Sequence, residues 1–106
     1  HPHHLLRVVD QIVADLAQPL AKNNGVRLLL TPTAAALLVD QAYDPAYGAR
    51  PLKRHIQKTI GTPVARMLVA REATGGSSIT VDAREGELVF QLSREDTDMS
   101  VAEASD

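Results

Sequence analysis

The first part of the chain repeats apolar residues at helical spacing. Within residues 5–20, one stripe is formed by Leu5, Val9, Ile12, Val13, Leu16 and Leu20. Pro19 lies near the end of this stripe and has no backbone donor, so we expect a kink or a break there. The Asn23-Asn24-Gly25 sequence that follows is a helix stop signal. The pattern therefore predicts a first helix over residues 5–20.

A short apolar run and two further helical patterns follow. The run Val26 to Leu30 is β-like but ambiguous. Thr31-Pro32 has the residue types of an N-cap and a first helical position, and this second helix is expected to end near Ala42. Pro51 begins a third helix, whose apolar stripe comprises Leu52, Ile56, Ile60, Val64 and Met67. Gly61-Thr62-Pro63 interrupts that stripe, which leaves open whether the region forms one helix or two helices joined by a bend.

Alternating apolar residues near the end of the chain predict a β-hairpin. Ile79 and Val81 alternate on one strand, the next carries Leu88, Phe90 and Leu92, and residues 84–87 form the turn. The element order predicts an α+β fold, with helices packed on a small sheet of about three strands. This folded domain covers residues 1–92. Residues 93–106 hold one Arg and five acidic residues, and with so little apolar surface they are expected to form a disordered acidic tail.

Composition narrows the class of protein. The chain has 106 residues, enough for one domain, and only three aromatic residues, so its core must consist of Leu, Val, Ile and Ala. No apolar run approaches the roughly 20 residues that span a bilayer. The absence of cysteine excludes disulfide frameworks and thiolate zinc sites, and fits a reducing cytoplasm. The net charge of −2 argues against a nucleic-acid partner.

The segment Tyr43 to Arg54 carries the most informative chemistry. Its glycine-containing turn delivers Arg50 to the start of the third helix, where unpaired N–H groups and the helix dipole favour an anion. A guanidinium matches phosphate oxygens with a planar fork of donors. Arg50 is therefore placed either to meet a phosphate or, alternatively, to pair with a carboxylate or face solvent. Tyr43 and Tyr47 are expected to pack the loop rather than to bind.

Other polar patterns favour plainer interpretations. Arg50, Arg54 and Lys58 recur at helical spacing, and a solvated face is a better interpretation than a nucleic-acid patch because stacking aromatics are missing. The histidines near the N-terminus lack a fixed acidic partner, so no metal site is predicted. His55 is expected at the surface or edge of the third helix rather than as a general base, and no nucleophile–base pair is present.

Several motifs together resemble one family. The string Tyr-Asp-Pro-x-Tyr-Gly-Ala-Arg-Pro-Leu-Lys-Arg at residues 43–54 is similar to the sensor-two motif of the Clp/Hsp100 AAA+ ATPases. His1-Pro2 resembles the start of that family's small domain, and Thr62-Pro63-Val64-Ala65 resembles the step after its sensor helix. The resemblance covers about residues 1–92. Within the family it is closer to the ClpB branch, since ClpC and ClpA more often have Arg at the position of Lys53.

The resemblance implies a small, or lid, domain of an unfolding or disaggregating chaperone. Arg50 matches the arginine that reports on nucleotide held by the large domain of the same subunit, and Gly48 and Ala49 match the turn that positions it. ATP or ADP with Mg²⁺ would be bound mainly by that large domain, preceding residue 1. Neighbouring subunits of a homohexamer and unfolded or aggregated polypeptides are the implied partners. The family usually has Gly at the position of Ala42, so the loop entry is expected to differ slightly.

Two alternatives to this interpretation remain open. One is the ATPase subunit of a Clp protease of the ClpC or ClpA type. The other is a free-standing protein-interaction module that uses the basic face of residues 50–58. The sequence contains no G-x-x-x-x-G-K-[ST] phosphate loop and no catalytic pair, so the fragment alone is not expected to be an enzyme. Neither nucleic acid nor membrane is expected as a partner.

Overall fold

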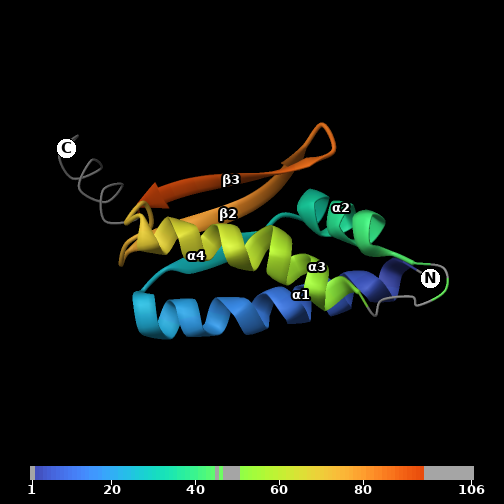
Figure 1. The fold of residues 1–106 in the computed structure, drawn as a ribbon, viewed down its shortest axis with the longest axis horizontal. Coiled ribbons are helices and arrows are strands. Elements are labelled where there is room, and N and C mark those ends of the chain that lie inside the picture. The colour runs from blue at the N-terminus through green and yellow to red at the C-terminus, as the bar shows by residue number, and fades with distance from the viewer. Residues whose placement is uncertain (1, 45, 47–50, 95–106) are drawn as a thin grey trace, which may run out of the picture.

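The computed structural model describes residues 2–44, 46 and 51–94, and its elements follow the predicted order (Figure 1). The helices are α1 (Pro2–Pro19), α2 (Pro32–Ala42), α3 (Leu52–Ile56) and α4 (Thr62–Val69). Two π-helical turns, η1 (Leu20–Asn24) and η2 (Gln57–Gly61), extend α1 and join α3 to α4. The strands are β1 (Arg27–Leu30), β2 (Ser77–Arg84) and β3 (Glu87–Arg94). The expected α+β fold is confirmed.

The three strands form one mixed sheet in the order β1-β2-β3. β1 lies parallel to β2, with Leu28 opposite Ile79, and β3 lies antiparallel to β2, with Val81 opposite Phe90. The ambiguous run before the second helix is therefore a strand. Its partner is far away in sequence, since the chain passes through α2, α3 and α4 before it reaches β2.

The hairpin turn lies where the sequence predicts it. Arg84 pairs with Glu87, and the two residues between them, Glu85 and Gly86, have φ of 53° and 77°. A two-residue turn with positive φ at both positions matches the right-handed twist of the strands that it joins. β3 continues to Arg94, two residues beyond the expected domain boundary, and the remainder of the expected tail lies outside the described residues.

One face of the sheet packs against the helices, and the core lies between the two layers (Figure 1). Leu28, Ile79 and Val81 are buried on this inner face, whereas Arg27 and Leu29 on the outer face of β1 are exposed. The third helical region contributes Leu52, Ile56, Ile60 and Val64, all of them buried. Residues spaced by four share one face of a helix. This spacing confirms the predicted stripe, and Met67 is partly buried at its end.

The first helix ends in two steps. Its regular α-helical part stops at Pro19, and the wider turn η1 carries the chain on to Asn24. Gly25 then takes a left-handed conformation with φ of 68° and donates its N–H to the carbonyl of Ala21 at 3.2 Å. The carbonyl of Gly25 accepts the N–H of Gly76 at 2.9 Å, which fastens this helix end to the segment before β2. The predicted stop signal is confirmed.

The third helical region passes its proline without a break. Ile56, Gly61 and Thr62 all keep right-handed helical φ and ψ, and the N–H of Thr62 donates to the carbonyl of Gln57, five residues earlier. Pro63 occupies the first turn of α4, where its missing donor disturbs least. The interruption expected at residues 61–63 is therefore a widened turn within one continuous helix.

Thr31 joins α2 to the sheet. Its hydroxyl oxygen accepts the N–H of Ala34 at 3.1 Å, which confirms the predicted N-cap, and its O–H donates to Oδ1 of Asp82 at 2.7 Å. This hydrogen bond, followed by one from the N–H of Ala83, holds the pKa of Asp82 below its ordinary value. The backbone N–H of Thr31 also donates to the carbonyl of Val81 at 3.0 Å. The start of α2 is thus fixed on β2.

Candidate functional site

The chain leaves α2 through an extended residue. Ala42 is buried at the end of α2, and Tyr43 follows with φ of −68° and ψ of 130°. No left-handed residue is needed here, so a methyl group is accommodated where the resembling family usually has Gly. Tyr43 is 53% exposed, and because most of the loop that its ring is expected to pack lies outside the described residues, that expectation stays a prediction. Tyr47 lies outside the described residues.

Only part of the loop before α3 is described. Oδ1 of Asp44 accepts the N–H of Ala46 at 2.7 Å, the side-chain-to-backbone bond that Asp makes at the start of turns. The three candidate site residues, Gly48, Ala49 and Arg50, lie outside the described residues. Their predicted roles stay predictions, and the structure contributes the two helix ends between which they lie.

The start of the helix that follows Arg50 is held by a backbone hydrogen bond and by the core. Pro51 is half-buried, and its carbonyl accepts the N–H of His55 at 2.9 Å. The next residue, Leu52, is 2% exposed and packs in the core. The end of the molecule where α2 finishes and α3 begins is also the end where α1 starts (Figure 1). Helix packing therefore fixes the C-terminal flank of the candidate loop.

His55 connects the two flanks of the loop. Its Nε2 lies 2.9 Å from Oε1 of Gln41 in the last turn of α2, and its carbonyl accepts the hydroxyl of Thr59 at 2.8 Å. Partial burial, followed by the nearby charge of Lys58, lowers the pKa of the imidazole. His55 thus lies at the edge of the helix, as predicted. The contact with Gln41 was not predicted, because no local pattern links residues 14 positions apart.

A basic surface covers the outside of α3 and η2. Lys53, Arg54 and Lys58 are exposed, and they line a shallow depression together with Gln57 and Thr62. They face away from the buried stripe that includes Ile56 and Ile60, which agrees with the predicted solvated face for Arg54 and Lys58, whereas Arg50 lies outside the described residues. Their charges make this surface attractive to anions.

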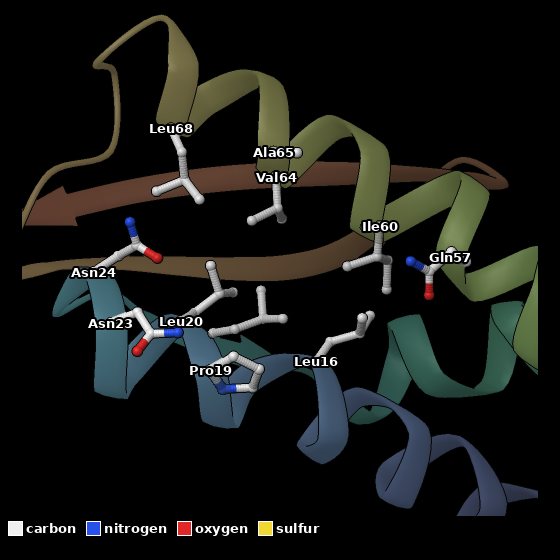
Figure 2. A pocket seen from close by; sticks show the side chains of 12 residues that line it. Leu16, Pro19, Leu20, Asn23, Asn24, Gln57, Ile60, Val64, Ala65 and Leu68 are labelled. Atoms are coloured by element: carbon white, nitrogen blue, oxygen red, sulfur yellow. The ribbon is translucent and has the colours of Figure 1, made fainter.

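A separate groove lies toward the other end of the molecule, between α1–η1 and η2–α4 (Figure 2). Its volume is about 190 Å³. Figure 2 shows Leu16 and Leu20 on one wall and Ile60 and Val64 on the other, with the amides of Asn23, Asn24 and Gln57 near the rim. The lining residues include no ionisable side chain, so the groove has no acid–base chemistry of its own.

The described part of the chain holds neither a metal-binding cluster nor a membrane-spanning helix. Within it, no three His, Cys, Asp or Glu side chains lie close enough to hold a metal ion. No described helix is long and apolar enough to cross a membrane. Every buried side-chain nitrogen or oxygen in these residues has a hydrogen-bond partner. The candidate chemistry therefore concentrates at the loop between α2 and α3.

Comparison with known proteins shows the family of this chain. A family model described as the C-terminal, D2-small domain of ClpB protein matches residues 1–81. The chain belongs to this ClpB family. The predicted Clp/Hsp100 membership is thus confirmed, and so is the preference for ClpB over ClpC and ClpA. The matched range includes the whole of the segment 43–54.

Individual ClpB proteins agree over most of the chain. Chaperone protein ClpB of Aquifex aeolicus is 40% identical over 101 residues, which cover 95% of this chain and 10% of that protein. ClpB of Bacillus cereus is 42% identical over 85 residues, covering 80% and 10%. ClpB of Corynebacterium glutamicum is 38% identical over 93 residues, covering 88% and 11%. The chain thus spans about a tenth of the length of these relatives.

Proposed function

We propose that this ClpB D2 small domain is the nucleotide-sensing lid of an ATP-dependent chaperone that unfolds or disaggregates proteins. The observation that carries the proposal is the sensor-two string at residues 43–54, which lies within the range matched by the family model. Arg50 contacts the phosphates of nucleotide bound in the large domain, and Gly48 and Ala49 shape the turn that aims it. ATP or ADP with Mg²⁺ is bound mainly by that large domain.

The geometry around the loop supports an anionic ligand. Arg50 precedes Pro51, the N-cap residue of α3, and the start of a helix favours negative charge. Lys53 and Arg54 follow on the exposed side of the same helix and add positive potential. The packing of Leu52 in the core fixes the start of the helix that follows the loop.

The domain also helps to close a homohexameric ring. Val69 is 84% exposed on α4, beside a shallow depression that includes Thr62, Ala65 and Arg66. We assign this outer face of α4 to the contact with the neighbouring subunit, because its exposed apolar side chain would be covered there. Such head-to-tail contacts between subunits generate a closed ring. Unfolded or aggregated polypeptides are the clients of the assembled ring. The absence of cysteine fits a reducing compartment, and we place the chaperone in the cytoplasm.

The alternatives are less well supported. An ATPase subunit of a Clp protease would belong to the ClpC or ClpA branch, whereas this chain matches ClpB. A free-standing interaction module would use the basic face of α3 and η2 and would have no need for the complete sensor-two string. Family membership therefore favours the lid of a chaperone, a domain that does not hydrolyse ATP alone.

The proposal is tested on the full-length chaperone that contains this domain. A charge-assisted hydrogen bond contributes about 1.5–3 kcal/mol, so Arg50→Ala is expected to lower ATP turnover by about 10- to 100-fold at saturating ATP. Arg84→Ala, which removes an exposed arginine at the hairpin, serves as the matched control and should retain wild-type turnover. Sedimentation velocity checks that both variants form rings. Unchanged turnover and ATP affinity in an assembled Arg50→Ala variant would refute the sensing role.

A further inference from the structure

β3 forms one edge of the sheet, and among the described residues no strand pairs with its outer side. It runs along the border of the molecule, with no described element beyond it (Figure 1). An edge strand presents a row of backbone donors and acceptors that can pair with a further strand. β1, at the other edge, has only four residues, whereas β3 has eight. β3 is therefore the longer of the two edges that could accept a strand.

The hairpin turn determines which backbone groups of β3 point toward this open edge. The two-residue turn has positive φ at both positions, so the residues that flank it, Arg84 and Glu87, form a hydrogen-bonded pair. Along an antiparallel strand the residues that bond one neighbour alternate with those that bond the other side. The N–H and C=O groups of Leu88, Phe90 and Leu92 therefore point outward.

The side chains of these three residues form an apolar row that the helices cover incompletely. Phe90 lies opposite Val81 and Leu92 opposite Ile79, so the row continues the inner face of the sheet. Ile79 and Val81 are fully buried, whereas Leu88 and Phe90 are half-buried and Leu92 is 39% exposed. A further strand beside β3 would remove more of this apolar surface from water, which is favourable.

The row is self-complementary. It reads Leu-x-Phe-x-Leu, an order that does not change when the strand is reversed about Phe90. A second β3 laid antiparallel, with a two-fold axis at Phe90, places Leu88 opposite the partner's Leu92 on both sides of the axis. A register centred on Gln91 would instead place Leu88 against the partner's Arg94. The side-chain pattern therefore favours the register centred on Phe90.

Charges at the ends of the strand agree with this register. Arg94 falls opposite the partner's Gly86, which lies between two acidic residues, the partner's Glu85 and the partner's Glu87. The guanidinium of Arg94 donates one hydrogen bond to Thr74 at 3.1 Å and has further donors. The basic end of each β3 thus meets acidic residues of the other copy, which is the charge complementarity expected of a specific contact.

We propose that the open edge of β3 is a homodimer interface, at which a second copy of this chain adds its β3 antiparallel and extends the three-stranded sheet across both copies. The contact is two-fold, so it closes with two copies and leaves neither β3 edge open. It uses other residues than the outer face of α4, which we assign to ring packing. The proposal does not depend on the role of Arg50.

Sedimentation velocity of the 106-residue chain at increasing concentration tests the proposal, and a monomer–dimer equilibrium is expected. Leu92→Lys puts a charge against the partner's Leu88 at two equivalent positions and should weaken the dimer by about 2- to 30-fold. Leu29→Lys is the matched control, because Leu29 is 42% exposed on the strand at the other edge. This control should dimerise as the wild type does, and circular dichroism checks that both variants are folded.

A compensating change tests the register. Leu88→Glu combined with Leu92→Lys puts a carboxylate opposite an ammonium at both equivalent pairs, and should regain part of the affinity that Leu92→Lys loses. Within one chain these positions lie about 13 Å apart along the strand, too far to compensate each other. If the combined variant fails to fold, an isotope-filtered NOE in the wild type decides. It should connect Hα of Val89 to Hα of the partner's Gln91, which this register brings face to face.

Three results would overturn the proposal. The first is a chain that stays monomeric at every concentration, whether the edge remains open or residues 95–106 cover it. The second is a dimer that Leu92→Lys and Leu29→Lys affect equally, since the contact would then use another surface. The third is a dimer without the NOE between Val89 and the partner's Gln91, because the strands would then not pair in the register centred on Phe90.

Discussion

Two helical regions of this domain each contain a proline, a glycine and a π-helical turn, but the first region ends there and the third continues. In the first region Pro19 precedes η1, and the left-handed Gly25 ends the helix. In the third region Gly61 keeps a helical conformation in η2, and the helix runs on through Pro63 into α4. Residue types alone therefore do not determine whether a helix ends.

Packing distinguishes the two turns. No residue of η1 is buried, whereas η2 contains Ile60, which is fully buried in the core. Such a buried side chain stabilises the helical conformation of the turn, because ending the helix there would remove that side chain from the core. η1 lacks this anchor, so its chain is free to turn at Gly25 and enter β1. Burial at one position thus decides between a stop and a widened turn.

Truncation of one leucine or isoleucine in each turn gives the largest expected effect on this comparison. Ile60→Ala leaves a cavity in the core and is expected to destabilise the domain by about 2–5 kcal/mol. Leu20 is the half-buried counterpart of Ile60 in η1, and Leu20→Ala should lower stability by only about 1 kcal/mol. Urea denaturation of the two variants measures both values. Equal losses would show that the anchor at Ile60 does not distinguish the turns.

Alanine in place of the two glycines sharpens the comparison with changes of opposite sign. Gly25 has φ of 68°, so Gly25→Ala should destabilise by about 1–2 kcal/mol. Its new Cβ would also approach Cα of Gly75 to 3.4 Å. At Gly61 the backbone is helical and a Cβ would meet only the flexible side chain of Gln57 at 3.5 Å, so Gly61→Ala should stabilise by about 0.5–1 kcal/mol. Thermal unfolding of both variants provides the check, and shifts of the same sign would contradict it.

The smallest expected effect is a pH dependence that arises in the third helical region. Partial burial and the charge of Lys58 hold the pKa of His55 below its ordinary value of 6.5, so the unfolded chain binds this proton more readily than the folded domain. The contribution of neutral His55 to stability is therefore present above about pH 6.5 and is lost as the pH falls below that value. Urea midpoints between pH 5 and 8 should show this loss in the wild type and a weaker one in His55→Gln. An identical pH profile in both proteins would exclude His55 as its source.

The sequence predicts best those features that local chemistry determines. Thr31 caps α2 through its own side chain, Gly25 supplies the left-handed residue at a helix end, and the Glu85-Gly86 turn follows directly from alternating apolar strands. Each depends on residues within a few positions of one another. The buried stripe of the third helical region was predictable for the same reason, since spacing by four is a local property.

Features that depend on distant partners were not predictable in the same way. The run at residues 27–30 became a strand because it pairs with β2 some 50 residues later, and its three leucines cannot signal that partner. The continuity of α3, η2 and α4 follows from the burial of Ile60 in a core built by other elements. The Gln41–His55 contact joins two helices across a loop. The role of Arg50 was inferred from resemblance to a known motif, because no contact of its own could be deduced from the sequence.

The hydrogen bond between Gly25 and Gly76, together with the parallel pairing of β1 and β2, has a consequence for biosynthesis. A chain emerging from the ribosome exposes β1 without its neighbouring strand until β2 follows it, about 50 residues later. At about 5–20 residues per second, that interval lasts several seconds, during which the apolar faces of α1 and α2 lack the sheet that covers them. The nascent domain would thus pass through a partly folded state with exposed apolar surface.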